Sequence, residues 1–354
     1  MQLNQINLVN FRNFSNYELL TSKQLNIIAG KNGAGKTSLL EAIYFLGMNR
    51  SFRNRSYQPV IKHQEKFCQI VGRLLTEKNS AVTIGIEKHL HATKSQLKVS
   101  EGNASTVSLA QLLPIQLINH ETFDLIDGSP QNRRAFMDWG VFYAEPEYQI
   151  TWQKFQYALK QRNALLKNMD DKQIVFWELQ LAEHAELLAQ YRLMYIDNLL
   201  PVLQEELKIL AFGEELSLEY YPGWENISLN YLSLLKQQRN RDSILGSTQL
   251  GPHRADIRIK IKNFPAEQIL SRGQQKMVGF FFRLAQAKLL YEKHQKRCLF
   301  LIDDLAAELD QTYLQLAYEI LIYLPNQIFM TCLETNTTGF LENSPNSQLI
   351  SLLS

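Results

Sequence analysis

The sequence is poor in cysteine. Its 354 residues include three, Cys68, Cys298 and Cys332, which are too widely separated to form a ligand-type pair. This spacing gives no sign of a disulfide framework or of a cysteine-rich metal site. It favours buried free thiols in a reducing cytoplasm.

Long apolar runs are also missing. No apolar segment with a basic flank occurs near the start, so we expect no secretory signal peptide. No run is long enough to span a bilayer. These two absences predict a cytoplasmic protein with no membrane partner.

Neither sign of charge is in large excess. Lys and Arg number 37 against 35 for Asp and Glu, a formal net charge of +2. This balance does not by itself indicate a nucleic-acid partner, so any DNA-binding surface must come from local basic clusters. The length is sufficient for two domains and at least one large core.

The most informative stretch is 26–41, which reads NIIAGKNGAGKTSLLE. Gly30 to Thr37 fits the phosphate-loop pattern G-x-x-x-x-G-K-[ST]. An apolar run at 25–29 predicts a buried strand before the loop, and apolar spacing at 38–46 predicts a helix after it. A strand, a glycine-rich turn and a helix are the context that this motif requires.

The phosphate loop predicts an ATP site. Its glycines allow a tight turn that aims backbone N–H groups at the phosphates, and the helix N-terminus adds a partial positive charge. We expect Lys36 to reach the β- and γ-phosphates and the Thr37 hydroxyl to hold Mg²⁺. The expected binding residues are Gly30, Lys31, Asn32, Gly33, Ala34, Gly35, Lys36, Thr37 and Ser38.

A second part of the site is expected near residue 303. The apolar run 299–302 ends in Asp303 and Asp304, as a Walker B strand does. We expect Asp303 to bind Mg²⁺, and Asp304 to orient and activate the attacking water. The two features together would complete one catalytic site.

The stretch SRGQQK, at 271–276, precedes a strongly apolar helical pattern. Ser271 is a plausible N-cap, and this turn would present N–H groups to an anion. One phosphate loop already serves the chain's own nucleotide. The stretch therefore predicts that Ser271, Gly273 and Gln274 complete the nucleotide pocket of another subunit; an ordinary capped helix is the alternative.

The remaining patterns predict a mixture of strands and helices. Residues 3–9 are expected to form a first strand, and a second strand is expected to end at Ala29. Period-two alternation over 67–99 predicts an antiparallel meander inserted after the first strand–helix unit. The stretch 148–212, nearly free of Gly and Pro, predicts two or three long helices with a break near 168–171.

Two basic clusters are candidates for DNA contacts. They are Arg50, Arg53 and Arg55 in the turn after the phosphate-loop helix, and Arg133 and Arg134 before the helical stretch. Contacts to phosphates would be largely independent of base sequence. The alternative is that these arginines have structural roles or lie in solvated loops.

The order of these motifs resembles the ABC-type ATPases of the structural-maintenance-of-chromosomes and Rad50 group, and within it the RecF family of bacterial recombination mediators. The resemblance covers nearly the whole chain. It departs from the RecF pattern at 119–122 and at Ala255. The matching pieces are LVNFRNF (8–14), LEAIY (40–44) to RSFR (50–53), GSP (128–130) to Arg133, Arg134, Phe136 and Asp138, GPHR (251–254), SRGQQK (271–276) and LIDDLAAELD (301–310).

The resemblance implies an α/β fold: an ABC-type ATPase head, with a mixed sheet and an antiparallel insertion, at 1–118 and 246–354, and a helical arm at 119–245. Two subunits would sandwich two ATP molecules, hold DNA when ATP is bound and open on hydrolysis. Lys36 and Asp304 would be catalytic, and Thr331 would take the switch position near the γ-phosphate; Gln116 is a weaker candidate for the Gln-loop.

The resemblance also implies a biological role and partners. The family acts with RecO and RecR to help load RecA onto gapped DNA, in replication, in the repair of DNA damage and in the SOS response. A weak DNA-dependent ATPase is expected. Two other classes stay open at this point: the nucleotide-binding subunit of a transporter, and a scaffold that barely hydrolyses ATP.

Overall fold

The computed structural model describes residues 1–21, 24–54, 56–76, 80–91, 95–100, 102–168, 171–225, 230–333 and 346–352. The chain divides into two compact units: a sheet unit of Met1–Phe123 with Gln295–Ser354, and a helical unit of Asp124–His294. The expected boundary at residue 246 differs from this division. Residues 246–294 belong to the helical unit because its last helix, α9 (Arg272–His294), packs against α4 (Pro130–Ala144) and α6 (Asp171–Leu207).

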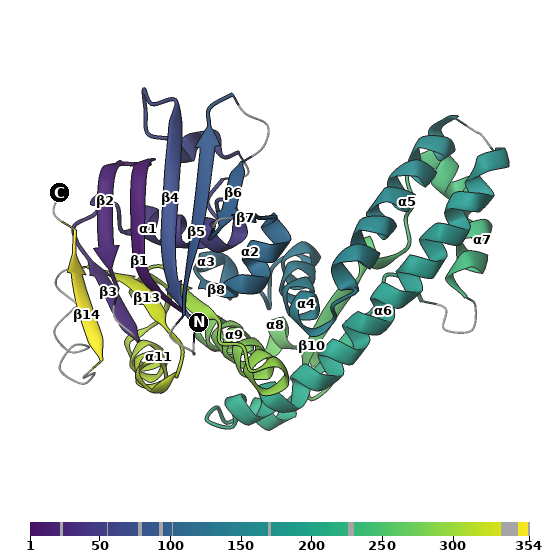
Figure 1. The fold of residues 1–354 in the computed structure, drawn as a ribbon. Helices are drawn as coiled ribbons and strands as arrows, with labels where there is room; N and C mark the ends of the chain where they lie inside the picture. Colours follow the sequence, from purple (N-terminus) through teal and green to yellow (C-terminus); the bar gives the residue numbers. More distant parts are fainter. Residues whose placement is uncertain are drawn as a thin grey trace. The chain divides into compact units, whose positions relative to one another are not determined.

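The sheet unit contains two sheets (Figure 1). In the first, every strand pairs antiparallel with its neighbours, in the order β2-β1-β4-β5-β6-β7. These strands are β1 (Gln2–Phe11), β2 (Phe14–Leu20), β4 (Phe67–Leu75), β5 (Ala81–His89), β6 (Gln96–Val99) and β7 (Gly102–Asn103).

The second sheet is parallel throughout, in the order β14-β3-β13-β12-β8. Its three central strands are buried along their whole length, as strands covered on both faces usually are. Its strands are β3 (Leu25–Ala29), β8 (Ile115–Ile118), β12 (Leu299–Ile302), β13 (Ile328–Cys332) and β14 (Ser347–Ser351).

The helix α1 (Lys36–Met48) contacts strands of both sheets. Its residues from Ser38 to Gly47 are all buried, as expected for a helix that is apolar around its circumference. Side chains of α1 and of both sheets form one hydrophobic core. The remaining elements of this unit are α2 (Thr106–Leu112), α3 (His120–Phe123), α10 (Leu305–Glu308), α11 (Gln311–Tyr323) and the 3₁₀ turn η1 (Gln58–Val60).

The helical unit is built around the hairpin of α5 (Tyr148–Asn168) and α6, which pack side by side (Figure 1). An antiparallel sheet in the order β11-β10-β9 accompanies the helices. The other elements are α7 (Tyr231–Leu245), α8 (Ala266–Ile269), η2 (Gly213–Glu215), η3 (Pro252–Arg254), β9 (Leu216–Tyr221), β10 (Asp256–Ile261) and β11 (Phe264–Pro265).

The structure confirms the meander over 67–99, as β4, β5 and β6, and the long helices on either side of residue 169. One prediction was wrong: the strand that ends at Ala29 is the third and not the second, because β2 at Phe14–Leu20 turns back along β1. The three cysteines are free and buried. None of the helices in the described part of the chain combines the length and the apolar run that a bilayer crossing needs.

Candidate functional site

The turn between β3 and α1 has the geometry that its glycines predict. Gly33 and Gly35 have φ of 86° and 99°, in the left-handed region that favours glycine. A Cβ atom at Gly35 would also lie 2.5 Å from Asn13 Nδ2, so a side chain there would require Asn13 to move. The expected strand, glycine-rich turn and helix are confirmed.

Lys36 is the first residue of α1, and its side chain folds back over the turn. Its ammonium donates to the carbonyl oxygens of Gly30 at 2.7 Å and Lys31 at 3.0 Å. No carboxylate of the described residues forms an ion pair with this ammonium. The charge is therefore held at the turn by neutral acceptors, which an anion can replace.

Asp303 is the meeting point of three elements. Its Oδ1 accepts hydrogen bonds from Thr37 Oγ1 at 3.1 Å, on α1, and from Thr331 Oγ1 at 2.9 Å, on β13. Thr331 Oγ1 also accepts the backbone N–H of Asp304 at 2.9 Å. The parallel strands β3, β13 and β12 are neighbours, so their carboxyl ends share one edge, where ligands bind in open α/β sheets.

The two aspartates differ in their surroundings. Burial raises the pKa of Asp303, as does the nearby charge of Asp304; the hydroxyls of Thr331 and Thr37 act in the opposite direction. Asp304 has φ of 52°, an uncommon conformation for a residue other than glycine. Its carboxylate makes no hydrogen bond or ion pair with any residue that the structure describes.

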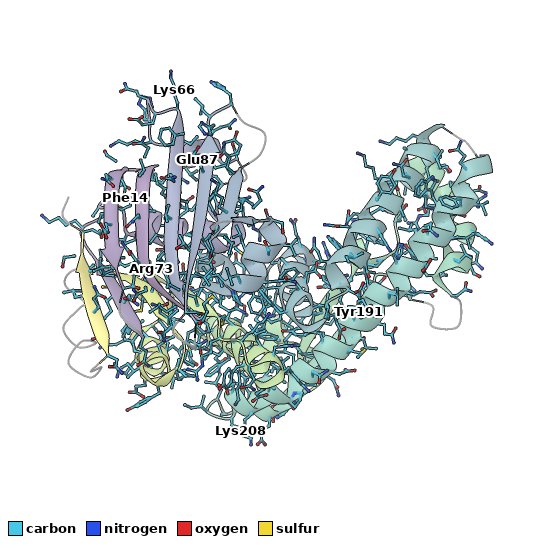
Figure 2. The ribbon with its side chains drawn as sticks, viewed as in Figure 1. Phe14, Lys66, Arg73, Glu87, Tyr191 and Lys208 are labelled. Carbon is cyan, nitrogen blue, oxygen red and sulfur yellow. The ribbon has the colours of Figure 1, made fainter. Side chains whose placement is uncertain are left out.

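A cavity of about 1090 Å³ opens onto these groups. The phosphate loop, Asp303, Asp304 and Thr331 line one side of it. Residues between Gln58 and Lys66 line another, and Figure 2 shows Lys66 at the end of the antiparallel sheet. The structure thus gathers Lys36, Thr37, Asp303, Asp304 and Thr331 around one cavity large enough for a small-molecule ligand.

Thr37 and Asp303 form a fitting donor set for Mg²⁺. This ion prefers oxygen ligands and is usually bound by one or two protein groups together with water and substrate phosphates. The hydroxyl and carboxylate oxygens already lie 3.1 Å apart, and the raised pKa of Asp303 marks a carboxylate that a cation would stabilise. No group of three or more His, Cys, Asp or Glu in the described residues could hold a metal ion by itself.

Arg12 and Glu41 are site residues that the chemistry of the motifs did not predict. Glu41 is fully buried on α1, and Arg12 binds its two carboxylate oxygens at 2.8 and 2.6 Å. Arg12 also donates to the carbonyl oxygen of Pro59 at 2.7 Å, and so joins α1 to the far wall of the cavity. In the sequence, Arg12 and Glu41 stood out only as members of the LVNFRNF and LEAIY pieces that resemble the RecF family.

The first basic cluster lies closer to this cavity than expected. Arg53 lines the cavity, and its Nη1 is 3.7 Å from Glu41 Oε2, because the turn after α1 folds back along the helix. Arg50 donates to the hydroxyl of Tyr44 at 3.3 Å. Arg55 lies outside the described residues. Arg53 is thus placed beside the phosphate-loop cavity.

The second cluster is held by partners inside the helical unit. Arg133 binds both carboxylate oxygens of Asp256 at 2.7 and 3.0 Å, and its side chain is 13% exposed. Arg134 donates to the carbonyl oxygen of Ala255 at 2.8 Å. These contacts favour the structural alternative for both residues.

Ser271, Gly273 and Gln274 lie in the helical unit, at the start of α9. Ser271 Oγ accepts the N–H of Gln274 at 3.3 Å, and Gln274 Oε1 accepts the N–H of Ser271 at 2.9 Å. This reciprocal capping box confirms Ser271 as the N-cap. Ser271 is exposed, as a group that serves another subunit must be. Gln116, by contrast, is buried within β8 and does not line the cavity.

Comparisons with known proteins find similar chains over nearly the whole sequence. The family model described as RecF/RecN/SMC N terminal domain matches residues 2–347. The chain is 39% identical to the DNA replication and repair protein RecF of Pseudomonas aeruginosa (strain LESB58), over 94% of this chain and 91% of that protein. The protein of the same name from Pseudomonas syringae pv. tomato (strain ATCC BAA-871 / DC3000) is 38% identical, with the same coverage.

Solved structures support the fold. A structure described as the recombination mediator protein RecF-ATP in the RecFOR pathway has a TM-score of 0.85 at 24% identity and covers 95% of this chain and 93% of its own. An Smc head domain derived from Pyrococcus furiosus has a TM-score of 0.59 at 16% identity, with 99% and 94% covered.

These similarities confirm the predicted fold class, a mixed α/β ATPase-head fold with helical segments. The expected mixed sheet is, in detail, two separate sheets, one parallel and one antiparallel. By sequence identity and coverage, the chain belongs to the RecF/RecN/SMC N-terminal domain family and, within it, to the RecF proteins.

Proposed function

We propose that this protein is an ATP-dependent DNA-binding protein of replication and recombinational repair. The observation that carries the proposal is the convergence of Lys36, Thr37 and Asp303 on one open cavity. Its family membership gives the biological setting, and a similar solved structure is described as bound to ATP. In this proposal ATP binding drives dimerisation and DNA clamping, and hydrolysis releases the DNA.

ATP would bind with its phosphates in the glycine-rich turn. Lys36 would exchange the carbonyl oxygens of Gly30 and Lys31 for β- and γ-phosphate oxygens, since its ammonium is held there only by neutral acceptors. The N–H groups at the start of α1 would bind the same phosphates. The segment from Gln58 to Lys66 would enclose the rest of the nucleotide.

Thr37 and Asp303 would hold Mg²⁺, which when bound neutralises charge on the phosphates during transfer. Asp304 would orient the attacking water, because its carboxylate is free of partners in the described structure and lies one residue from the metal ligand. Thr331 would couple the Mg²⁺ ligand Asp303 to the water-orienting residue Asp304. Its hydroxyl joins the Asp303 carboxylate to the Asp304 backbone, so a change at Asp303 reaches Asp304 directly.

Ser271, Gly273 and Gln274 would complete the pocket of a second copy of the chain. In this arrangement the ATP-bound homodimer is the DNA-binding form. RecO and RecR would be its protein partners, as the RecFOR pathway named for the similar solved structure suggests. Together they would help load RecA at single-stranded gaps.

The experiment that tests the proposal is the substitution Lys36→Arg. Arg keeps the charge but replaces a compact ammonium by a planar fork that the turn does not fit, so we expect ATP hydrolysis to fall by about 10²-fold or more. Circular dichroism checks that the variant remains folded. A folded Lys36→Arg protein that hydrolyses ATP at the parent rate would contradict the assignment of this loop.

A scaffold that barely hydrolyses ATP is the second candidate function. Single-turnover hydrolysis with and without duplex DNA separates the two. A rate that DNA does not raise, together with ATP-dependent dimerisation, would support the scaffold.

A further inference from the structure

A second polar cavity lies entirely within the helical unit. It has a volume of about 340 Å³ and shares no lining residue with the phosphate-loop cavity. Side chains from the end of β9, from α7 and from the segment before β10 meet there. The polar groups that line it are Tyr221, Gln238, Arg241, Gln249 and Arg254.

A close crossing of two backbone segments forms one side of this cavity. The N–H of Gly251 donates to the carbonyl oxygen of Gly223 at 3.1 Å. A Cβ atom at Gly223 would lie 2.0 Å from the oxygen of Gly251, and both glycines have positive φ, of 100° and 132°. The crossing therefore requires glycine and fixes Tyr221 and Arg254 beside α7.

Two arginines of this cavity form no ion pair with any residue that the structure describes. Arg241 and Arg254 are both exposed, and neither forms a hydrogen bond or ion pair through its side chain with any described residue. Most other arginines of the helical unit are paired, for example Arg133 with Asp256 and Arg258 with Glu219. Two guanidinium groups that open into one cavity without a carboxylate partner make it a site for an anion.

The surroundings strengthen the positive field. Burial, followed by the charges of Arg254 and Arg134, lowers the pKa of His253 to about 4 against an opposing hydrogen bond to Thr248. On α7 the charge of Arg239 is balanced by its ion pair with Glu178, which leaves Arg241 as the α7 cation that lines the cavity. A carboxylate does lie near the cavity, since burial and then the charge of Glu225 raise the pKa of Tyr221.

We propose that Arg241 and Arg254 bind phosphate groups of a DNA backbone, with the side-chain amide of Gln238 as a further donor. Guanidinium groups bind phosphate oxygens in a planar, bidentate manner. Both arginines are exposed at the surface rather than enclosed, which favours an extended polyanion over a single enclosed phosphate. The proposal rests on the proposed DNA-binding function and adds a contact surface in the helical unit that none of the basic clusters predicted from the sequence includes.

The test measures binding of a fluorescein-labelled duplex to the full-length protein, with ATP, at several salt concentrations. We expect the double substitution Arg241→Ala, Arg254→Ala to weaken binding at least tenfold at low salt. It should reduce the slope of log K against log salt concentration by about 1 to 2, since each lost phosphate contact contributes about 0.9. The double substitution to Lys should keep most of the slope because it keeps the charges.

Lys236→Ala is the matched control. It removes one positive charge from the same helix, five residues before Arg241 and thus about 140° around the axis, and Lys236 does not line the cavity. It should leave the salt slope within error of the parent. Glu225→Gln should strengthen binding, a gain that a damaged fold cannot produce.

The outcomes separate this site from the proposed function. If the double Ala variant binds DNA with the parent's affinity and salt slope, Arg241 and Arg254 are not a DNA contact, although the protein still binds DNA elsewhere. A parent that binds no DNA at any salt overturns the proposed function, and the nucleic-acid ligand with it. Inorganic phosphate serves as the second probe: a phosphate-induced rise in melting temperature in the parent, lost in the double Ala variant, with no DNA binding, would reassign the cavity to a free phosphate.

Discussion

Asp303 is a carboxylate whose surroundings oppose its charge. Its pKa is raised by burial above the ordinary value for an aspartate. A carboxyl group with a raised pKa in the folded state contributes stability that is full below the unfolded pKa, near 3.9, and is lost as the pH rises through the folded pKa. At neutral pH the ionised group therefore destabilises the nucleotide-free protein.

Asp303→Asn should consequently raise the melting temperature of the nucleotide-free protein at pH 7.5, and the gain should shrink as the pH is lowered to about 4, near the ordinary pKa of an aspartate. The same variant should lose the stabilisation that ATP with Mg²⁺ gives the parent, because a metal ligand has been removed. Scanning calorimetry at both pH values measures the two effects. Glu121→Gln, which removes an exposed carboxylate from the same unit, serves as the control.

A lower melting temperature for nucleotide-free Asp303→Asn at pH 7.5 would contradict this account of the site. It would mean that the two hydroxyl groups stabilise the charge of Asp303 more than burial opposes it. A gain in stability together with a loss of function is common where a residue serves a site rather than the fold.

Single residues also mark the limit of what the sequence could predict. The phosphate loop and the acidic pair were recognisable because their chemistry lies within a few adjacent residues. The Arg12–Glu41 pair was not, since the two side chains are 29 positions apart and meet only when β1 lies beside α1. Arg53 was a candidate DNA contact because of its charge, and its position at the cavity, 3.7 Å from the same buried Glu41, could not be predicted from that charge.

At the scale of elements, α5, α6 and α7 are joined through one buried arginine. Arg162, fully buried on α5, binds Asp242 at 2.7 Å and Glu178 at 3.2 Å, and it also donates to Thr248 at 2.7 Å. Arg239 reaches Glu178 from α7 at 2.6 Å. Both carboxylates are buried, so the guanidinium of Arg162 is what allows them to remain charged there.

Arg162→Met should therefore destabilise the helical unit by about 3–5 kcal/mol, because it leaves buried carboxylates without their partner. Urea unfolding followed by tryptophan fluorescence reports this unit selectively, since all four tryptophans lie within it: Trp139, Trp152, Trp177 and Trp224. Arg239→Met is the matched control. Its side chain is 25% exposed and leaves Glu178 paired, so we expect a loss of about 1 kcal/mol. If both variants lost the same free energy of unfolding, the burial of the arginine would not determine how much its removal destabilises the unit.

The elements themselves were largely predictable, and their partners were not. Period-two alternation gave β4 to β6, and helical spacing gave α5 and α6, because both patterns are local. The strand β2 was missed because its seven residues, FSNYELL, include four exposed positions and lack strict alternation. The separation into two sheets depends on pairings between distant strands, such as β1 with β4 and β3 with β13, which no local pattern encodes.

The whole-molecule proposal is that ATP joins two copies of the chain. Ser271→Arg tests the contribution of the second copy. This residue lies in the helical unit and is proposed to serve the partner's nucleotide, so the variant should bind ATP with nearly the parent's affinity but should fail to dimerise. Equilibrium binding of a fluorescent ATP analogue and sedimentation velocity measure the two properties. Loss of binding by the folded monomer would place Ser271 in its own subunit's pocket.

The most direct test of the account is the mass of Asp304→Asn in solution with ATP and Mg²⁺. This variant keeps Lys36, Thr37 and Asp303, so it should bind ATP, but it lacks the carboxylate proposed to orient water. We expect hydrolysis to fall by about 10²-fold or more, as for other catalytic groups of this kind. Light scattering should then show a stable dimer of twice the 41.0 kDa chain mass, and a monomer when ATP is omitted. A variant that stays monomeric with ATP bound, or that hydrolyses ATP at the parent rate, would contradict the central claim.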